Sequence, residues 1–150
     1  MITLIGHGYI GTHIHNELLS ENLEHNWISH TDSIPTNTDY IINCAGYTGV
    51  PNVDACEHNK QKTIQGNVLF PLNLERTTNV PIMHLSSGCV YTGYKDGGWL
   101  ETDTPNFNFD NASFYSASKT LAQELLTPYM NKSYLMRLRM PFCAERSEEH

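Results

Sequence analysis

The sequence has little positive charge and no long apolar run. Nine Lys and Arg stand against sixteen Asp and Glu in 150 residues, so the formal net charge is −7, and the basic residues do not cluster. This balance argues against nucleic acid or an anionic membrane as a partner. No apolar run approaches the roughly 20 residues that a membrane-spanning helix needs. We therefore expect no membrane association and a cytoplasmic location.

Paired cysteines and metal-ligand spacings are also lacking. The eight histidines are scattered, and none belongs to a metal-ligand pattern, so we predict no metal site. The cysteines form no C-x-x-C pair, which favours a reduced chain without disulfides. They are Cys44, Cys56, Cys89 and Cys143.

Apolar segments of strand length alternate with segments of helical period. The spacing predicts helices over about 9–21, in two segments between 53 and 78, and from Tyr115 to about 130. We expect polar loops over 31–38 and 93–111. This alternation predicts an α/β fold with a doubly wound parallel sheet, a Rossmann fold, whose ligand lies at the carboxyl ends of the strands. The expected strands are 2–5, about 26–29, 40–43, 82–85 and 133–138.

A glycine fingerprint follows the first apolar run. Gly6, Gly8 and Gly11 form the pattern G-x-G-x-x-G between a predicted strand and a predicted helix. In this context the first glycine allows a tight turn, the second lets a pyrophosphate approach, and the third lets helix and strand pack closely. Tyr9 and Ile10 would open the helix whose N-terminus faces the phosphates. A glycine-rich turn that binds nothing is the alternative.

Tyr115 and Lys119 lie four residues apart at the start of a helical pattern. Residues at this spacing share one helix face. An ammonium favours the phenolate, so we expect Lys119 to lower the pKa of Tyr115 toward the range of a working proton donor. Alone, the pair would also fit an ordinary solvated helix face.

Several stretches resemble the extended short-chain dehydrogenase/reductases. The superfamily resemblance rests on the fingerprint, on Asn43–Gly46, on Leu85–Tyr91 and on the Tyr-x-x-x-Lys pattern. Within the superfamily the chain is most similar to nucleotide-sugar enzymes, above all the bifunctional UDP-4-keto-6-deoxyglucose 3,5-epimerase/4-reductases that make UDP-rhamnose in plants and some large viruses. The stretches that carry this closer resemblance are Gly49–Glu57, Glu101–Phe107, Ser113–Lys119 and Leu138–Pro141.

The resemblance implies a reductase site. Ser87 would hydrogen-bond the C4 carbonyl of a 4-keto-6-deoxyhexose nucleotide, Tyr115 would protonate that oxygen, and Lys119 would bind the nicotinamide ribose. These donors are needed because an alkoxide develops where hydride adds. Ser86 is an adjacent alternative, which strand alternation should point elsewhere.

Cys89 matches a cysteine that the resemblance assigns to acid/base chemistry in 3,5-epimerisation. A ketone acidifies neighbouring C–H bonds, and a thiol can carry that proton. A small buried hydrophobe is the alternative role. The loop after the third strand resembles a substrate-facing loop, so Thr48 and Asn52 join Ser87, Cys89 and Tyr115 as expected substrate-binding residues.

The cofactor implied is a nicotinamide dinucleotide. No carboxylate follows the second strand until Asp32, and Ser29 or His30 could bond a 2′-phosphate, so NADP(H) is preferred and NAD(H) is the alternative. The expected cofactor-binding residues are Gly6, Gly8, Tyr9, Ile10, Gly11, Ser29, Asn43, Cys44, Ala45, Gly46, Tyr115, Lys119 and Pro141.

Residues 1–142 are expected to form the NAD(P)-binding domain, and 143–150 a charged tail where the chain is truncated. Members of the resembled family continue into a C-terminal substrate lobe, which is missing here. A nucleotide-sugar 4-epimerase or dehydratase is an alternative, although a dehydratase would carry Asp-Glu where Gly88 and Cys89 stand. A truncated NADP-binding module without catalysis is another. We also expect a homodimer through the helix carrying Tyr115 and Lys119.

Overall fold

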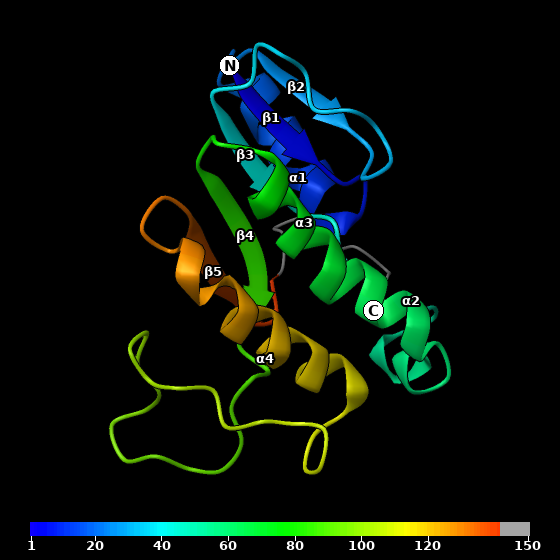
Figure 1. The fold of residues 1–150 in the computed structure, drawn as a ribbon, viewed down its shortest axis with the longest axis vertical. Coiled ribbons are helices and arrows are strands. Elements are labelled where there is room, and N and C mark those ends of the chain that lie inside the picture. Colours follow the sequence, from blue (N-terminus) through cyan, green and yellow to red (C-terminus); the bar gives the residue numbers. More distant parts are fainter. Residues whose placement is uncertain (142–150) are drawn as a thin grey trace.

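Five short apolar segments form one parallel sheet. A computed structural model describes residues 1–141, so the predicted tail and the last residue of the predicted domain lie outside the described part. The sheet order is β2-β1-β3-β4-β5, with every neighbouring pair parallel (Figure 1). The strands are β1 Ile2–Ile5, β2 His25–Ile28, β3 Tyr40–Asn43, β4 Ile82–Ser87 and β5 Tyr134–Leu138.

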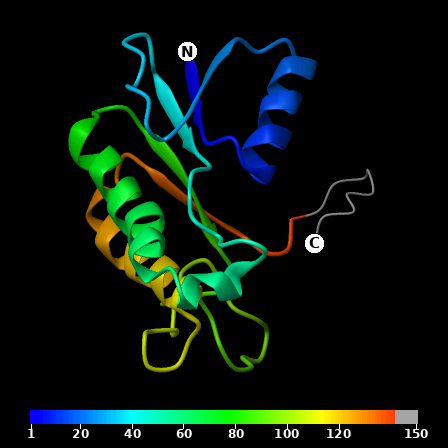
Figure 2. The ribbon, with the colours of Figure 1, turned by 90° about the vertical axis from the view of Figure 1, so that its right-hand side faces the viewer.

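Helices cover both faces of this sheet. Helix α1, Tyr9–Ser20, lies on one face, and α3, Phe70–Thr77, lies with α4, Phe114–Leu126, on the other (Figure 2). The inner strands β1, β3 and β4 are therefore covered and carry buried apolar residues, whereas the edge strands β2 and β5 are only partly buried. Ile5, Ile41 and Ile82 are fully buried and form the core with α3. The predicted doubly wound fold is confirmed.

The order in which the chain adds strands to the sheet reverses beside β1. The chain leaves β1 through α1 to reach β2 at one edge, and then returns past β1 to pair β3 on its other side. No helix occupies the return, as the polar segment 31–38 predicts. Ligands of open α/β sheets bind at the carboxyl ends of the strands where such a reversal occurs. Here that point lies between the ends of β1 and β3.

The segment between β3 and β4 is helical but interrupted. It contains the 3₁₀ helix η1, Val53–Glu57, then α2, Lys60–Ile64, and the π-helical turn η2, Gln65–Leu69, which leads into α3. Pro71 lies in the first turn of α3. Because proline has no N–H to donate, it fits a helix start and not an interior. The π-helical turn lies just before Pro71, while the helical run continues from Lys60 to Thr77.

Helix α4 is fixed at its N-terminus by two side chains. The Ser113 hydroxyl accepts the Ser116 N–H at 3.2 Å, and Glu57 Oε1 accepts the Phe114 N–H at 2.6 Å. The helix ends at Leu126, and a short 3₁₀ turn, η3, Thr127–Tyr129, completes the segment predicted to be helical. Among the described residues, no helix is both long and apolar enough to cross a membrane.

Candidate active site

The three positions of the fingerprint favour glycine for different physical reasons. Gly6 has a φ of +109°, and a Cβ there would lie 2.9 Å from the Ala45 nitrogen. A Cβ on Gly11 would lie 2.1 Å from the Gly6 carbonyl oxygen, so only glycine allows β1 and α1 to approach this closely. A Cβ on Gly8 would meet nothing within 4 Å. Packing therefore accounts for Gly6 and Gly11 but leaves Gly8 unexplained.

Gly8 faces open space at the start of α1. It is the N-cap residue, it supplies no side-chain cap, and the first turn contains no acidic residue. The positive end of the helix dipole is thus left for an external anion. The turn itself is held by Trp27, whose indole N–H donates to the Gly6 carbonyl at 3.0 Å. These residues fit the pyrophosphate of a dinucleotide.

Ser87 and Tyr115 come together at the end of β4. Ser87 is the last residue of the strand; its hydroxyl accepts the Cys89 N–H at 3.0 Å and lies near enough to Tyr115 to lower the pKa of that phenol. The neighbouring Ser86 faces elsewhere, because its hydroxyl accepts from Gln123 Nε2 at 2.8 Å. The alternation predicted for the two serines is confirmed.

The expected effect of Lys119 on Tyr115 is wrong in this structure. Burial raises the pKa of Tyr115, nearby Cys89 raises it further, and only the Ser87 hydrogen bond lowers it. Lys119 Nζ lies 5.9 Å from the centroid of the Tyr115 ring, and burial lowers the pKa of Lys119 itself to about 8. Desolvation is the largest cause of the pKa shift of each group, and neither shift has the other group among its causes. Tyr115 is consequently held in its protonated form.

Asn67 joins the loop after β3 to α4. Its Oδ1 accepts the Tyr47 N–H at 2.7 Å, and its Nδ2 donates to the Tyr47 carbonyl at 2.9 Å and to Ser118 Oγ at 3.2 Å. A Cβ on Gly46 would lie 3.2 Å from Asn67 Oδ1 and 3.4 Å from Lys119 Nζ. The motifs in the sequence do not single out Asn67. The available signal was a fully polar residue inside an apolar helical stretch.

Two cavities flank the loops that follow β2 and β3. One, of about 540 Å³, is lined by Ala45 and Gly46 and by the face of α3. The other, of about 360 Å³, is lined by Ser29 and Asp32. His30 lines both, so they lie next to each other along the edge of the sheet. This edge is the predicted adenine and ribose side of the cofactor.

Two residues on the adenine and ribose side have features that the sequence did not reveal. The Asp32 carboxylate folds back and accepts the Ser29 N–H at 2.7 Å, which places a negative group at the end of β2. Burial raises the pKa of Cys44 to about 12. Cys44 is therefore a neutral packing thiol beside the glycine turn and contributes no chemistry of its own.

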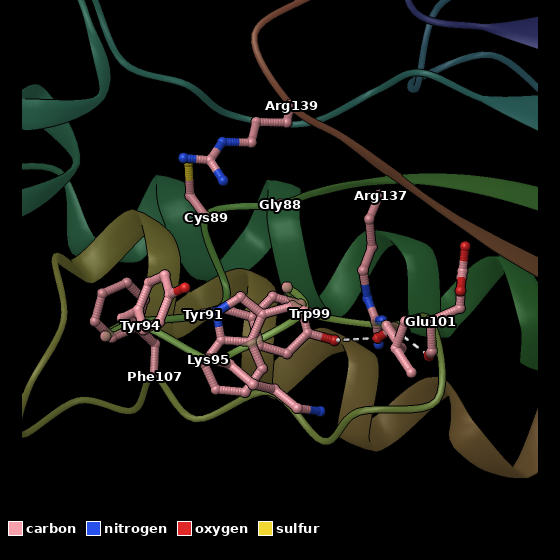
Figure 3. A pocket seen from close by; sticks show the side chains of 14 residues that line it. Gly88, Cys89, Tyr91, Tyr94, Lys95, Trp99, Glu101, Phe107, Arg137 and Arg139 are labelled. Atoms are coloured by element: carbon pink, nitrogen blue, oxygen red, sulfur yellow. Dashed lines mark hydrogen bonds between the residues drawn. The ribbon is translucent and has the colours of Figure 1, made fainter.

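A third cavity, of about 830 Å³, opens beside Cys89 between the long loop and the end of β5 (Figure 3). Arg137 holds the loop there. Its Nη1 donates to the Glu101 carbonyl at 3.0 Å, and its guanidinium lies 5.4 Å from the Tyr91 ring centroid. Trp99 stacks on Tyr91 with centroids 4.7 Å apart. We call this space the Cys89 cavity; Gly88, Cys89, Tyr91, Tyr94, Lys95, Trp99, Phe107, Arg137 and Arg139 are among its lining residues.

Some predicted residues lie apart from these spaces. Thr48 and Asn52 do not line the Cys89 cavity. Asn52 instead caps η1, because its Oδ1 accepts the Asp54 N–H at 3.0 Å. Pro141 is exposed at the end of the described chain. Among the residues that the structure describes, no group of His, Cys, Asp and Glu could hold a metal ion.

Comparison with known proteins identifies the relatives of this chain. Residues 8–148 match the family described as the RmlD substrate binding domain. The chain is 40% identical over 116 residues to the trifunctional UDP-glucose 4,6-dehydratase/UDP-4-keto-6-deoxy-D-glucose 3,5-epimerase/UDP-4-keto-L-rhamnose-reductase RHM1 of Arabidopsis thaliana. It is 39% identical over 115 residues to a bifunctional dTDP-4-dehydrorhamnose 3,5-epimerase/reductase of the same plant. Each match covers 71% of this chain, but only 17% and 37% of the respective relatives.

Solved structures share the fold. The L780 UDP-rhamnose synthase of Acanthamoeba polyphaga mimivirus matches with a TM-score of 0.81 and 22% identity, over 98% of this chain and 58% of that one. A dTDP-4-dehydrorhamnose reductase of Bacillus anthracis, solved in complex with NADP, matches with a TM-score of 0.78 and 20% identity, over 97% and 55%. The present chain thus spans little more than half of these structures.

Proposed function

Because the chain belongs to the RmlD substrate binding domain family, we propose that its protein reduces a 4-keto-6-deoxyhexose nucleotide toward rhamnose with NADPH. The observation that carries the proposal is the meeting of the Ser87 and Tyr115 hydroxyls at the carboxyl end of β4, with Lys119 buried beside Gly46. Two hydroxyl donors and one ammonium at a strand end are what stabilise an alkoxide that develops from a ketone.

In this proposal each side chain has one task. The bound nicotinamide supplies the hydride. The Ser87 hydroxyl donates a hydrogen bond to the C4 carbonyl oxygen, and Tyr115 gives its proton to that oxygen as the negative charge develops. Burial keeps Tyr115 protonated and ready to donate. Lys119 holds the nicotinamide ribose, for which its position beside Gly46 is suitable.

The cofactor would lie across the reversal between β1 and β3. Gly8 and the first turn of α1, with Tyr9, Ile10 and Gly11, hold the pyrophosphate. Ser29 and His30 face the adenosine ribose, and the loop 43–46 lies on the adenine side. NADP(H) is the preferred form and NAD(H) the alternative, because the carboxylate of Asp32 is engaged by the Ser29 N–H instead of standing free for ribose hydroxyls.

The nucleotide sugar would enter the Cys89 cavity. Cys89 is exposed and lines that cavity, two residues beyond Ser87, so its thiol can reach the carbons that flank a ketone held by Ser87. We propose that it serves as an acid/base in 3,5-epimerisation. Arg137 and Arg139 give the cavity two positive groups for a diphosphate, and Thr48 and Asn52, which lie outside the cavity, would contact only a part of the substrate that extends beyond it.

The proposed partners and location extend this picture. A homodimer through α4 is our proposal, supported by the exposed Glu124 and Leu125 on that helix. The described cysteines are free, which fits a reducing, cytoplasmic location. Light scattering of purified protein, with Leu125→Glu as the variant, tests the dimer. A monomer at micromolar concentration contradicts it.

The decisive experiment uses the protein containing this chain at the length of its relatives. UDP-4-keto-6-deoxyglucose and NADPH are supplied, NADPH oxidation is followed optically, and the sugar product is identified by NMR. We expect a rhamnose nucleotide. A 6-deoxyglucose or 6-deoxygalactose product with unexchanged ring hydrogens would indicate a simple 4-reductase. Interconversion of UDP-glucose and UDP-galactose would favour the 4-epimerase, and NADP binding without any turnover would favour a non-catalytic module.

A further inference from the structure

Four polar side chains, three of them buried, form a connected series that the proposed mechanism does not use. Lys132 Nζ lies 3.1 Å from Glu75 Oε2 and also donates to the Thr78 carbonyl at 2.9 Å. Glu75 Oε1 lies 3.0 Å from His84 Nε2. The side chains of Glu75 and His84 are 0% and 3% exposed. A carboxylate this deeply buried needs both of these partners.

The chemistry of the groups fixes the direction of every hydrogen bond. A carboxylate can only accept hydrogen bonds, so His84 Nε2 carries a hydrogen and donates it in a hydrogen bond to Glu75 Oε1. Burial lowers the pKa of His84 from its usual 6.5, so the ring is neutral near pH 7 and Nδ1 is an acceptor. Nδ1 therefore accepts from Asn43 Nδ2, 3.2 Å away. This orientation leaves Asn43 Oδ1 to accept the Ala45 N–H at 3.1 Å.

This series of hydrogen bonds thus ends on the loop that borders the proposed cofactor side of the site. Ala45 and Gly46 line the cavity of about 540 Å³, and Gly46 packs against Lys119. His84 and Lys119 also line one small internal cavity of about 20 Å³. The hydrogen-bonded pair Glu75 of α3 and His84 of β4 is in this way connected through Asn43 to the backbone that would receive the dinucleotide.

We propose that Glu75, His84 and Asn43 are positioning residues for the loop 44–46, and that protonation of His84 releases this loop and weakens dinucleotide binding. This inference rests on the proposed function. When both ring nitrogens carry protons, His84 Nδ1–H faces the Asn43 amide N–H₂, and two donors oppose each other. Flipping the amide moves the conflict to the Ala45 N–H. No orientation of Asn43 satisfies both neighbours.

The charged groups around His84 determine the pH at which its ring becomes protonated. Among the described residues, Glu75 of α3 favours the charged ring, whereas Lys119 of α4 and Lys132 before β5 disfavour it. Burial and the two lysines outweigh Glu75, so the folded protein resists the proton more than the unfolded chain does. Loosening of the loop should therefore begin only as the pH falls below about 6.5, the ordinary value.

The test measures NADP⁺ binding and loop structure on the 150-residue chain between pH 7.5 and 4.5. NADP⁺ is the probe because it survives acid. Calorimetry gives the dissociation constant, and NMR of ¹⁵N-labelled protein follows the His84 ring and the Ala45 amide without any substitution. We expect the Ala45 resonance to shift with the same midpoint as His84, and Kd to rise at least tenfold across that midpoint.

Two variants separate the positioning role of His84 from other effects of low pH on NADP⁺ binding, including protonation of the 2′-phosphate. His84→Asn offers Asn43 an acceptor that does not titrate, so its Kd should change with pH clearly less than the wild-type value. His58→Asn, an exposed histidine outside the chain, is the matched control and should keep the wild-type profile. An Ala45 amide that ignores His84 titration, or equal profiles in all three proteins, would overturn the inference. Absence of NADP⁺ binding at pH 7.5 would instead count against the proposed function, and the Ala45 titration would still decide whether His84 positions the loop.

Discussion

At the scale of the residue, the environment of Tyr115 decides which protonation state it offers. Burial holds its pKa above the usual 10, although the nearby Ser87 hydroxyl lowers it in part. A group held neutral in this way is a proton donor in the resting protein. Any shift toward the phenolate must come from what binds in front of it.

Tyr115→Phe should remove this donor with little change in packing. In the protein at the length of its relatives, we expect the rate of 4-keto reduction to fall by about 10²–10⁴-fold, the usual contribution of a positioned acid. The cofactor should bind as before, because the phenol oxygen contributes little to the pyrophosphate or adenine contacts. Stopped-flow measurement of NADPH oxidation, with calorimetry as the control, checks both statements. Normal turnover by the variant would show that Tyr115 is not the acid.

Cys89→Ser should separate epimerisation from reduction. The replacement keeps nearly the same volume but raises the pKa of the acid/base group far above neutrality. It should suppress exchange of deuterium from heavy water into the sugar ring by about 10²-fold or more. Reduction of a ketone that is already epimerised should persist, because Ser87, Tyr115 and Lys119 remain. Mass spectrometry of the product reports both steps, and full deuterium incorporation would leave Cys89 a packing residue.

Lys119→Met should stabilise the free protein. Burial lowers the pKa of Lys119 from 10.5 to about 8. Between these two pH values the amine is therefore protonated in the unfolded chain but largely neutral in the folded protein. Wild-type stability from this group is therefore complete above about pH 10.5 and is lost as the pH falls toward 8. At pH 7 the free energy of unfolding of the variant should exceed that of the wild type by about 1–3 kcal/mol. This difference should shrink as the pH rises toward 10.5. Urea titrations measure it; Lys62→Met, on the exposed side of α2, is the control. A destabilised Lys119→Met protein would contradict the argument.

At the scale of the element, β1, the glycine turn and α1 form one unit in which packing requires Gly6 and Gly11, and in which we propose a ligand role for Gly8. Gly8→Ala adds a methyl group that meets no protein atom within 4 Å. We expect the variant to fold like the wild type but to bind NADP⁺ at least tenfold more weakly, because the methyl occupies the space of the pyrophosphate.

Gly11→Ala is the matched comparison for the Gly8 variant. Its Cβ would fall 2.1 Å from the Gly6 carbonyl, so α1 must move and the midpoint of thermal unfolding should drop by several degrees. Circular dichroism melting and calorimetry measure the two effects separately. Unchanged NADP⁺ affinity in Gly8→Ala would remove the ligand reason for Gly8.

The elements themselves follow from local patterns, whereas the links between them do not. Short apolar segments predict all five strands, and the helical period predicts the segments between 53 and 78. β4 continues two residues beyond the expected Leu85 because Ser86 and Ser87 pair with Arg137 and Leu138 of β5. Local periodicity cannot show such pairing between distant segments.

The electrostatic error and the missed residues have the same origin. The spacing of Tyr115 and Lys119 indicates a shared face, but the sign of their pKa shifts depends on burial by other elements. Glu75 and His84 look like ordinary polar residues of a helix and a strand until α3 is packed on the sheet. Their partnership, like that of Asn67 with Tyr47, exists only after folding.

At the scale of the whole molecule, the sheet is two units joined at β1. The β1–α1–β2 unit carries the glycine turn and the ribose side. The β3–β4–β5 unit carries the loop 43–46, Ser87 and, through α4, the Tyr115 and Lys119 pair. A dinucleotide that lies across the reversal contacts both units. Its binding free energy should therefore appear as stability of the whole domain and not of one part.

NADP⁺ should raise the unfolding midpoint of the 150-residue chain more than NAD⁺ does. At a free concentration of 100 times Kd, a ligand specific for the folded state adds about 2.7 kcal/mol, which corresponds to several degrees for a domain of this size. We expect the preference to arise at the end of β2, where Ser29 and His30 would face a bound 2′-phosphate while Asp32 is turned to the Ser29 N–H. Asp32→Asn removes the remaining negative charge there, so it should enlarge the difference between the two cofactors. Differential scanning calorimetry at matched cofactor concentrations measures all four combinations. Equal shifts with NADP⁺ and NAD⁺ in the wild type, or a larger one with NAD⁺, would contradict the proposed preference for the phosphorylated cofactor.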